Sequence, residues 1–542
     1  MSEEDPLKKF FPFAEYRPYQ RETIIEIVKA FSSGKDNVLF EGPTGSGKSV
    51  VGMTVANILG TCYYLTIQKN LMTQLVSEFG KQMVDVRGRN AYPCWFMNEH
   101  QKSNKHFSAD RGKCIQKSKS FLDFCTNKRK CAYKNRLDLA AISPQVLFNF
   151  SSFLYQREMA TRFTEPKKLL LLDECHNTES QIMNFVVATI NGEDIDQTLP
   201  NFEEAELYIS YFEAVKAGEI LLEKLQNARE QLKAITGGDA SEVDNLDIQD
   251  AEKAGKLLKE VSKYEEVFTK YMQLKEYSKS IRCVSDYDQE NNAVSIRPLY
   301  ATYHTPKLLL PGGEKRLFMS ATILNSKVFG ESIGLNMSKT HFVKVPHTFP
   351  RQNRLIHLDY AGPMTFKSRE ETMPKLIKKI DEIMDKHAGE KGIIHCQSFK
   401  LMNDIIRGLS KKNAGRLLDQ SMFEDKDKLL QSHKISKCTV IIAPAMHEGL
   451  DLKDDLSRFQ IVAKVPYPDS RGNKQLDLRM KENWNYYLWL TAIKLIQSVG
   501  RSVRSETDYA STYILDSDFD KFFNQCDKAH LLPDWFIESL AI

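Results

Sequence analysis

The amino-acid sequence predicts an α/β protein with two lobes, each built on a doubly wound parallel sheet. The apolar run Asn37–Glu41 enters a glycine-rich loop, after which we expect a helix from Gly47 to Leu59 and a buried strand at Cys62–Ile67. The order strand, loop, helix, strand is typical of parallel sheets. Similar apolar runs recur beyond residue 340, at 393–394, 440–443 and 461–465. Since a domain takes ~150 residues, a chain of 542 residues has room for this arrangement.

The remaining elements follow the same pattern, with two interruptions. The runs Leu169–Leu172 and Arg316–Met319 end in polar residues and are predicted as central strands of the first lobe. Residues 475–500 are predicted as one long amphipathic helix of the second lobe. The predicted division is 1–87, 141–177 and 313–340 for the first lobe, 88–140 for a cysteine-rich insertion, 178–312 for a mainly helical arch, and 341–542 for the second lobe.

The predicted arch holds two long charged helical patterns, Glu203–Ala234 and Asp250–Ser280. The turn-rich segment 237–245 separates them, so an antiparallel helical hairpin is expected. A solvated scaffold is the alternative interpretation of this charge pattern.

Composition limits the classes of protein to consider. Basic and acidic residues nearly balance, 75 against 71, so any nucleic-acid surface must be local. The N-terminus has no signal-peptide pattern, and no apolar run is long enough to span a membrane. Most of the ten cysteines are scattered in apolar runs, as small buried side chains are, which fits a reducing compartment. We therefore expect a cytoplasmic protein.

The segment GPTGSGKS matches the phosphate-binding loop pattern, with a strand before it and a helix after it. Glycines let backbone amides turn toward phosphate oxygens, Lys48 places a positive charge on the β- and γ-phosphates, and Ser49 offers a hydroxyl to Mg²⁺. The predicted nucleotide contacts of this loop are Gly42, Pro43, Thr44, Gly45, Ser46, Gly47, Lys48 and Ser49.

An acidic tetrapeptide, Asp173-Glu174-Cys175-His176, follows the predicted strand at 169–172. We expect Asp173 to hold Mg²⁺ and Glu174 to accept a proton from the attacking water. His176 is expected to couple the nucleotide site to the neighbouring lobe. Cys175 is better explained as a core side chain than as a nucleophile.

The segment QSVGRSVR in the second lobe offers Gln497, Arg501 and Arg504. The two arginines lie three residues apart, so they are predicted to share one helical face. An arginine supplied from a second lobe is worth roughly 10³–10⁵ in rate. The catalytic site would then close only when the lobes meet, which links hydrolysis to motion. A surface arginine pair is the alternative.

Further polar segments lie at predicted strand ends or before the phosphate loop. Gln20 is expected to read adenine through its amide and Tyr19 to stack, although Arg17-Pro18-Tyr19-Gln20 is also typical of a helix start. The segment Ser320–Thr322 is a candidate relay. Glu448, Gly449 and Asp451 are predicted nucleotide contacts at the interface between the lobes.

In this order, RPYQ (17–20), GPTGSGKS (42–49), DECHN (173–177), SAT (320–322), EGLD (448–451) and QSVGRSVR (497–504) resemble the motifs of superfamily 2 helicases. The D-E-x-H-N form and the two insertions resemble in particular the XPD branch, with its DinG and FANCJ relatives. The resemblance implies two RecA-like lobes, ATP-dependent 5′→3′ DNA helicase activity and a role in nucleotide excision repair. Without the longer C-terminal region of eukaryotic XPD, the chain resembles the compact archaeal form.

Cys94, Cys114, Cys125 and Cys131 fall in one window, where 11 Lys or Arg face only three acidic residues between Cys94 and Arg136. Four thiolates suit a 4Fe–4S cluster or Zn²⁺, and free thiols are the third possibility. Resemblance to XPD assigns the four as 4Fe–4S ligands, although their intervals of 19, 10 and 5 residues depart from the usual family spacing. The basic residues suit a phosphate backbone, and Tyr92 and Trp95 suit stacking on bases.

The leading hypothesis is therefore a monomeric helicase that uses ATP and Mg²⁺, binds single-stranded and forked DNA, and has repair proteins as candidate partners. A nucleotide-dependent DNA-binding or damage-verification module without processive unwinding is the second hypothesis. An RNA motor of the same superfamily is the third.

Overall fold

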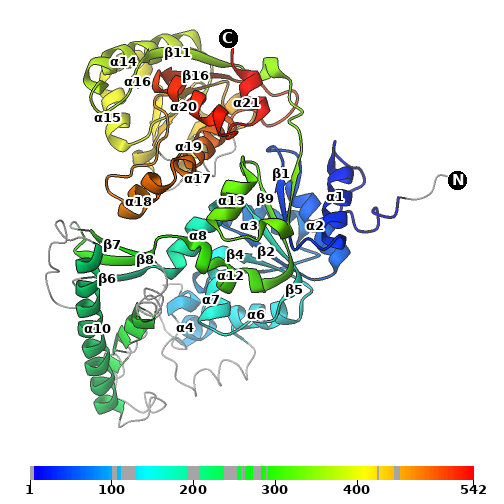
Figure 1. Cartoon of the computed structure of the whole chain (residues 1–542), viewed down its shortest axis with the longest axis vertical. Coiled ribbons are helices and arrows are strands. Elements are labelled where there is room, and N and C mark those ends of the chain that lie inside the picture. Colours follow the sequence, from blue (N-terminus) through cyan, green and yellow to red (C-terminus); the bar gives the residue numbers. More distant parts are fainter. Residues whose placement is uncertain are drawn as a thin grey trace.

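The computed structural model describes two lobes, one above the other in Figure 1, with a helical arm beside the lower lobe. It describes residues 5–100, 107–111, 130–191, 207–236, 282–288, 291–423, 426–444 and 452–541, together with parts of 253–272. Both lobes have a parallel sheet with helices packed on it, as the sequence predicts.

The first lobe is built on a seven-stranded sheet in the order β10-β1-β9-β5-β2-β4-β3, with every neighbouring pair parallel. All five residues of β1 and of β2 are buried, because helices cover both faces of the sheet. The carboxyl ends of the strands therefore meet at one edge. The strands are β1 (Asn37–Glu41), β2 (Cys62–Thr66), β3 (Val84–Val86), β4 (Gln145–Asn149), β5 (Lys167–Asp173), β9 (Gly313–Ser320) and β10 (Thr340–Lys344).

Two helices of the first lobe, α7 and α13, begin at an asparagine whose side chain caps the helix. Asn149, for example, accepts a hydrogen bond from the Ser151 backbone N–H at the start of α7. The helices are α1 (Gln20–Ser32), α2 (Lys48–Leu59), α3 (Lys69–Phe79), α4 (Trp95–His100), α6 (Ala132–Ile142), α7 (Phe150–Glu158), α8 (Thr178–Val186), α12 (Thr305–Leu308) and α13 (Ser326–Ser332).

The second lobe is built on a six-stranded parallel sheet in the order β11-β16-β15-β12-β14-β13. Its strands are β11 (Ile356–Gly362), β12 (Gly392–His395), β13 (Leu417–Asp419), β14 (Val440–Ala443), β15 (Phe459–Val462) and β16 (Ser511–Asp516). Its helices are α14 (Arg369–Lys386), α15 (Phe399–Gly408), α16 (Lys411–Ala414), α17 (Lys426–Ile435), α18 (Lys474–Glu482), α19 (Trp484–Val499), α20 (Asp518–Lys528) and α21 (Asp534–Ser539).

The prediction of one helix over residues 475–500 is wrong, because the chain forms α18 and α19 there. Asn483 separates them with a backbone outside the helical region, and its side chain accepts a hydrogen bond from the Tyr486 backbone N–H. Asparagine at this position caps the second helix and so favours the break.

The predicted lobe boundary at residue 340 is also displaced. β10 (Thr340–Lys344) pairs in parallel with β1 and is an edge strand of the first sheet. The chain therefore crosses to the second lobe after Lys344, through Val345–Phe349.

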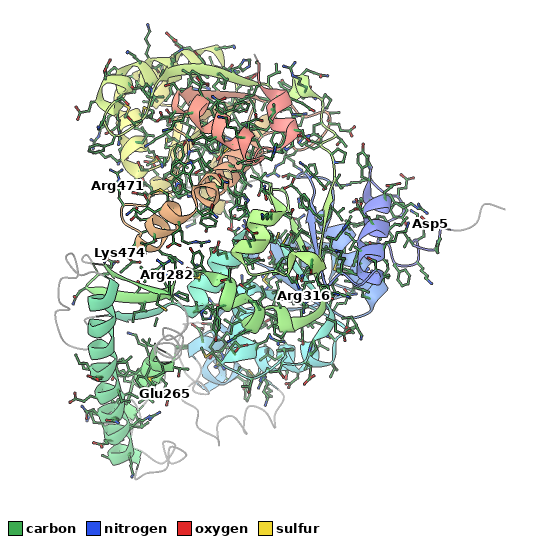
Figure 2. The ribbon with its side chains drawn as sticks, in the orientation of Figure 1. Asp5, Glu265, Arg282, Arg316, Arg471 and Lys474 are labelled. Carbon is green, nitrogen blue, oxygen red and sulfur yellow. The ribbon has the colours of Figure 1, made fainter. Side chains whose placement is uncertain are left out.

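The predicted arch contains α10 (Leu207–Thr236), which matches the first expected helix. It also contains an antiparallel sheet in the order β6-β8-β7 that the sequence analysis did not anticipate. Its strands are β6 (Ala188–Asn191), β7 (Cys283–Asp288) and β8 (Ala293–Pro298). Figure 2 shows Arg282, at the start of β7, near Lys474, at the start of α18.

Residues from both lobes share one hydrophobic core. Phe318 and Phe329 of the first lobe belong to the same buried cluster as Trp489 and Ile496 of the second. The Trp489 indole N–H donates to the Ile323 carbonyl at 2.9 Å, which ties α19 to the loop after β9. Among the described residues, no helix combines the length and apolar character that a membrane span requires.

Candidate functional site

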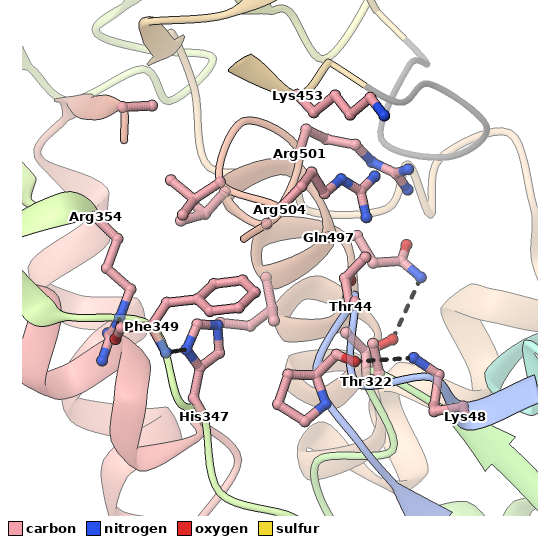
Figure 3. A pocket seen from close by; sticks show the side chains of 18 of the residues that line it. Thr44, Lys48, Thr322, His347, Phe349, Arg354, Lys453, Gln497, Arg501 and Arg504 are labelled. Atoms are coloured by element: carbon pink, nitrogen blue, oxygen red, sulfur yellow. Dashed lines mark hydrogen bonds between the residues drawn. The ribbon is translucent and has the colours of Figure 1, made fainter. Parts of the chain in front are cut away.

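A cleft of about 650 Å³ lies between the lobes at the carboxyl edge of the first sheet. Figure 3 shows Thr44, Lys48 and Thr322 of the first lobe on one side and Gln497, Arg501 and Arg504 of the second lobe on the other. The structure thus brings together the phosphate-binding loop and the arginine segment, which are more than 450 residues apart in the sequence.

Two glycines of the phosphate-binding loop have positive φ, +85° at Gly45 and +77° at Gly47. A Cβ at Gly45 would lie 2.8 Å from the Arg504 carbonyl oxygen, and one at Gly47 would lie 2.2 Å from Gln20 Nε2. Both the backbone conformation and the space therefore require glycine. The loop is in direct contact with the arginine segment.

Lys48 lies at the start of α2 and is partly buried. Its ammonium group donates to the Gly42 carbonyl at 3.0 Å and to the Pro43 carbonyl at 3.4 Å. Burial lowers the pKa of Lys48, and the nearby Glu174 and Asp173 carboxylates oppose that shift. A cation in this position is suited to an anionic ligand lying along the loop.

Asp173 ends β5 and is buried. Burial and the charge of Glu174 raise the pKa of Asp173, whereas Lys48 and Tyr64 act in the opposite direction. The Tyr64 hydroxyl donates to Asp173 Oδ2 at 2.8 Å, and the Glu174 backbone N–H donates to Oδ1 at 3.0 Å. Asp173 is thereby held in one orientation, as a metal-binding carboxylate needs to be.

Sequence analysis missed Tyr64. It lies in β2, which pairs with β5, and its partner in register is Leu171, two residues before Asp173. The available signal was a phenol in the strand CYYLT, all of whose residues are buried. The pKa of Tyr64 is raised well above its usual value by burial and by the Asp173 charge.

Glu174 has a left-handed backbone, with φ of 52°, and its side chain lines the cleft. The carboxylate remains about one-third exposed, at 34%. The Glu174 carboxylate lies near enough to Lys48 to affect its pKa, and its Oε2 lies 3.5 Å from His176 Nδ1. An acceptor in that position is suited to a general base.

His176 is buried between the lobes and makes contacts on both sides of its ring. Its Nε2 lies 2.7 Å from Gln497 Nε2 and 2.8 Å from Asn177 Nδ2, and both amide nitrogens are donors. With both amides donating to Nε2, the ring proton lies on Nδ1, which donates to Ser320 Oγ at 2.8 Å. Gln497 also donates to Thr322 Oγ1 at 3.3 Å, so His176, the 320–322 segment and the second lobe form one network.

Arg501 and Arg504 both line the cleft, but the prediction that they share a helical face is wrong. Helix α19 ends at Val499, and both arginines lie in the turn that follows. Asp508 organises this turn, because its buried carboxylate accepts from the backbone N–H groups of Arg504 and Asp454, each at 3.1 Å.

Gln20 is buried against the phosphate-binding loop. Its Nε2 donates to the carbonyls of Ser46 at 3.1 Å and Gly47 at 3.4 Å, and its Oε1 accepts from the Arg17 backbone N–H at 2.9 Å. These bonds give the amide a role in supporting the loop, which differs from the predicted adenine contact. Tyr19 is half-exposed and lines an adjoining cavity of about 450 Å³ with Phe349, and Arg17 reaches the Gly45 carbonyl at 2.8 Å.

Several predicted residues lie outside the described part of the chain, namely Glu448, Gly449, Asp451, Cys114 and Cys125. Cys94 and Cys131 are described, and residues on both sides of Cys94 contact residues on both sides of Cys131. The Tyr92 and Tyr133 rings lie 5.6 Å apart, and Lys130 Nζ lies 4.2 Å from the centre of the Trp95 ring. Among the described residues, no three His, Cys, Asp or Glu side chains gather to hold a metal ion.

Two protein families match parts of the chain. The family described as helicase C-terminal domain matches residues 380–537, and the family described as type III restriction enzyme, res subunit, matches residues 13–210. These segments cover most of the second lobe and the beginning of the first.

Similar proteins extend the match to nearly the whole chain. A protein named as a probable ATP-dependent helicase of Methanocaldococcus jannaschii is 20% identical over 98% of this chain and 97% of its own length. The ATP-dependent DNA helicase DinG of Photobacterium profundum is 27% identical over 41% of this chain and 34% of that protein.

A solved structure described as an XPD helicase has a TM-score of 0.62 at 13% identity, covering 96% of this chain and 99% of that chain. A second, described as the apo form of XPD, has a TM-score of 0.57 at 13% identity, covering 95% and 98%. The predicted fold of two RecA-like lobes is confirmed.

Proposed function

We propose that the chain is an XPD-like superfamily 2 helicase that hydrolyses ATP in the cleft between its lobes and uses the energy to translocate on DNA. The single observation that carries this proposal is the cleft itself. It places Lys48, Glu174 and Gln497 around one space, together with the turn that carries Arg501 and Arg504, which we call the arginine turn. Both lobes therefore contribute to the cleft.

Each of these residues has a separate role in ATP hydrolysis. Lys48 and the loop amides bind the phosphates, and Asp173 with Ser49 would hold Mg²⁺, whose charge stabilises the phosphoryl group. Glu174 accepts a proton from water. Gln497 Oε1 is buried and has no hydrogen-bond partner among the described residues, so it is an acceptor able to orient that water. Arg501 and Arg504 neutralise charge that develops on the transferred group.

Coupling to motion follows from the position of these groups. Gln497 and the arginine turn belong to the second lobe, so any opening of the cleft separates them from Lys48 and breaks the bond to His176. Hydrolysis is therefore fastest in the closed arrangement, and product release favours opening. Alternation between the two arrangements is the movement that a translocating motor needs.

We further propose that the track is single-stranded DNA, that movement runs 5′→3′, and that the protein unwinds duplexes during nucleotide excision repair. Similarity to XPD and to a protein named as a DNA helicase supports this choice. The damage-verification module remains the second candidate because it needs the same lobes.

We propose that Cys94, Cys114, Cys125 and Cys131 hold a 4Fe–4S cluster. The ring contacts beside Cys94 and Cys131 support this assignment. They hold the segment that contains Cys94 next to the segment that contains Cys131. When bound, such a cluster cross-links a basic insertion that is too small to form much of a core.

Strand displacement on tailed duplexes tests the proposal. A 5′-tailed duplex should be unwound only with ATP and Mg²⁺, and a 3′-tailed duplex should not be. ATP hydrolysis stimulated by single-stranded DNA without any displacement would favour the verification module. Stronger stimulation by RNA than by DNA would contradict the assigned track.

A further inference from the structure

One face of α18 carries three polar side chains with partners outside the second lobe. Gln475, Arg479 and Glu482 are spaced four and three residues apart, so they project from the same side of the helix. We call them the α18 face. Figure 1 shows α18 directly above β7 and β8, and Figure 2 shows Arg282 in the gap between them.

The two ends of the α18 face bind the base of the antiparallel sheet. Gln475 Nε2 donates to the carbonyls of Pro298 at 3.0 Å and Leu299 at 3.1 Å, at the end of β8. Glu482 accepts hydrogen bonds from Arg282, which precedes β7, and from the Tyr300 hydroxyl. These donors lower the pKa of Glu482 and keep it charged.

The centre of the α18 face binds α8. Arg479 pairs with Glu179, and both side chains are more than nine-tenths buried. Tyr486 donates to the same carboxylate at 2.8 Å, and the guanidinium lies 3.7 Å from the Tyr486 ring centre. The pair is thus satisfied on both sides, as a buried ion pair must be.

These contacts connect α18, α8 and the antiparallel sheet. Glu179 lies in α8, three residues after His176. Helix α8 leads into β6, so it joins the loop that carries His176 to the antiparallel sheet. Helix α10 packs against β7 in the same sheet. A displacement of α18 would act on α8 and on the sheet together.

We propose that the α18 face is the contact through which the second lobe moves the antiparallel sheet and α10 as the cleft opens and closes. This inference rests on the proposed function, because it assigns the arm a movement driven by nucleotide. Arg479 and Glu482 are positioning residues, since they touch neither the cleft nor any nucleotide bound there. The antiparallel sheet and α10, which form this arm, thereby change their position relative to the first lobe once in each ATP cycle.

A charge exchange at the edge of the α18 face tests the inference on the full chain. Arg282 and Glu482 are partly exposed, at 56% and 34% of their side chains, so their exchange should be tolerated by the fold. Backbone hydrogen exchange over residues 282–300 is measured with and without a non-hydrolysable ATP analogue and Mg²⁺. The same variants are assayed for strand displacement per ATP hydrolysed.

The wild type should show a nucleotide-dependent change in exchange at β7 and β8. Glu482→Arg and Arg282→Glu should each reduce that response, and displacement per ATP, at least about fivefold. The double exchange should restore most of both. Lys481→Glu is the control, since Lys481 pairs with Asp477 within its own helix and should change neither readout.

An exchange response that is absent in the wild type, or equal in the single variants, would overturn the inference. So would a double variant no better than the singles. An exchange response of the expected pattern without any strand displacement would support the inference and count against unwinding alone.

Discussion

The Gln497 side-chain nitrogen lies 2.7 Å from His176 Nε2 and so joins helix α19 of the second lobe to the catalytic loop after β5 of the first. His176 in turn donates to Ser320, at the end of β9. A single imidazole therefore contacts both lobes and the segment that the sequence indicated as a relay. The predictions below follow from this network and from the cleft beside it.

Replacing Gln497 by alanine should uncouple the lobes. The variant should bind ATP with nearly wild-type affinity, hydrolyse it more slowly because the attacking water loses an acceptor, and lose its stimulation by single-stranded DNA by about 5- to 150-fold. Ser498→Ala is a matched control, because the Ser498 hydroxyl donates to the Lys494 carbonyl within its own helix. The measurement is the steady-state ATPase rate with and without single-stranded DNA. Full stimulation by DNA in the Gln497 variant would argue against coupling through His176.

Replacing Tyr64 by phenylalanine should shift the acid limb of the pH profile. The tyrosine hydrogen bond favours the charged form of Asp173, so its loss raises the pKa of that carboxyl further. Because Mg²⁺ needs the carboxylate, activity should disappear at a higher pH than in the wild type, with the alkaline plateau preserved. The measurement is kcat/KM for ATP against pH at saturating Mg²⁺, and an unmoved acid limb would show that Asp173 does not titrate there.

Replacing Lys48 by alanine should abolish ATP hydrolysis and leave DNA binding largely intact. Lys48 hydrogen-bonds to the phosphate-binding loop through the Gly42 and Pro43 carbonyls, where the phosphates are proposed to lie. Lys29→Ala, an exposed position on α1, should leave both activities unchanged. ATP turnover and DNA affinity are measured in parallel; substantial hydrolysis by the Lys48 variant would place the nucleotide elsewhere.

Replacing Cys94 or Cys114 by serine should remove the cluster. The anaerobically purified wild type should be brown and contain about four iron atoms per chain. Either variant should lose the colour and most strand displacement but keep some ATPase. Cys438→Ser, in the second lobe, should retain iron. A colourless wild type that contains zinc would replace the iron–sulfur proposal with a zinc site.

The strands that were predicted are continuous apolar runs, whereas β3, β4, β10, β11, β13 and β16 were not predicted. Buried parallel strands need no polar side, so Asn37–Glu41 and Val440–Ala443 stand out from their surroundings. The α18–α19 break was missed because a helical period continues across Asn483. The antiparallel sheet was missed because β7 reads CVSDYD, a polar segment that lacks a continuous apolar run.

The candidate site was predictable to the extent that it consists of local motifs. Lys48, Asp173 and the arginine turn each have a recognisable neighbourhood in sequence. The contacts within the site do not, because Tyr64 and Asp173 are 109 residues apart and His176 and Gln497 are 321 apart. Gln20 shows the opposite case, in which a local motif was found and its amide was assigned to adenine although it binds the phosphate loop.

The central claim is that nucleotide is held between Lys48 and the arginine turn, and single-turnover hydrolysis by arginine variants tests it most directly. Arg501→Ala and Arg504→Ala should slow the chemical step by roughly 10³-fold or more for the residue that contacts the γ-phosphate, with ATP affinity little changed. Lys453→Ala, on the rim of the same cleft, provides the comparison. A chemical step within twofold of wild type in both arginine variants would contradict the account.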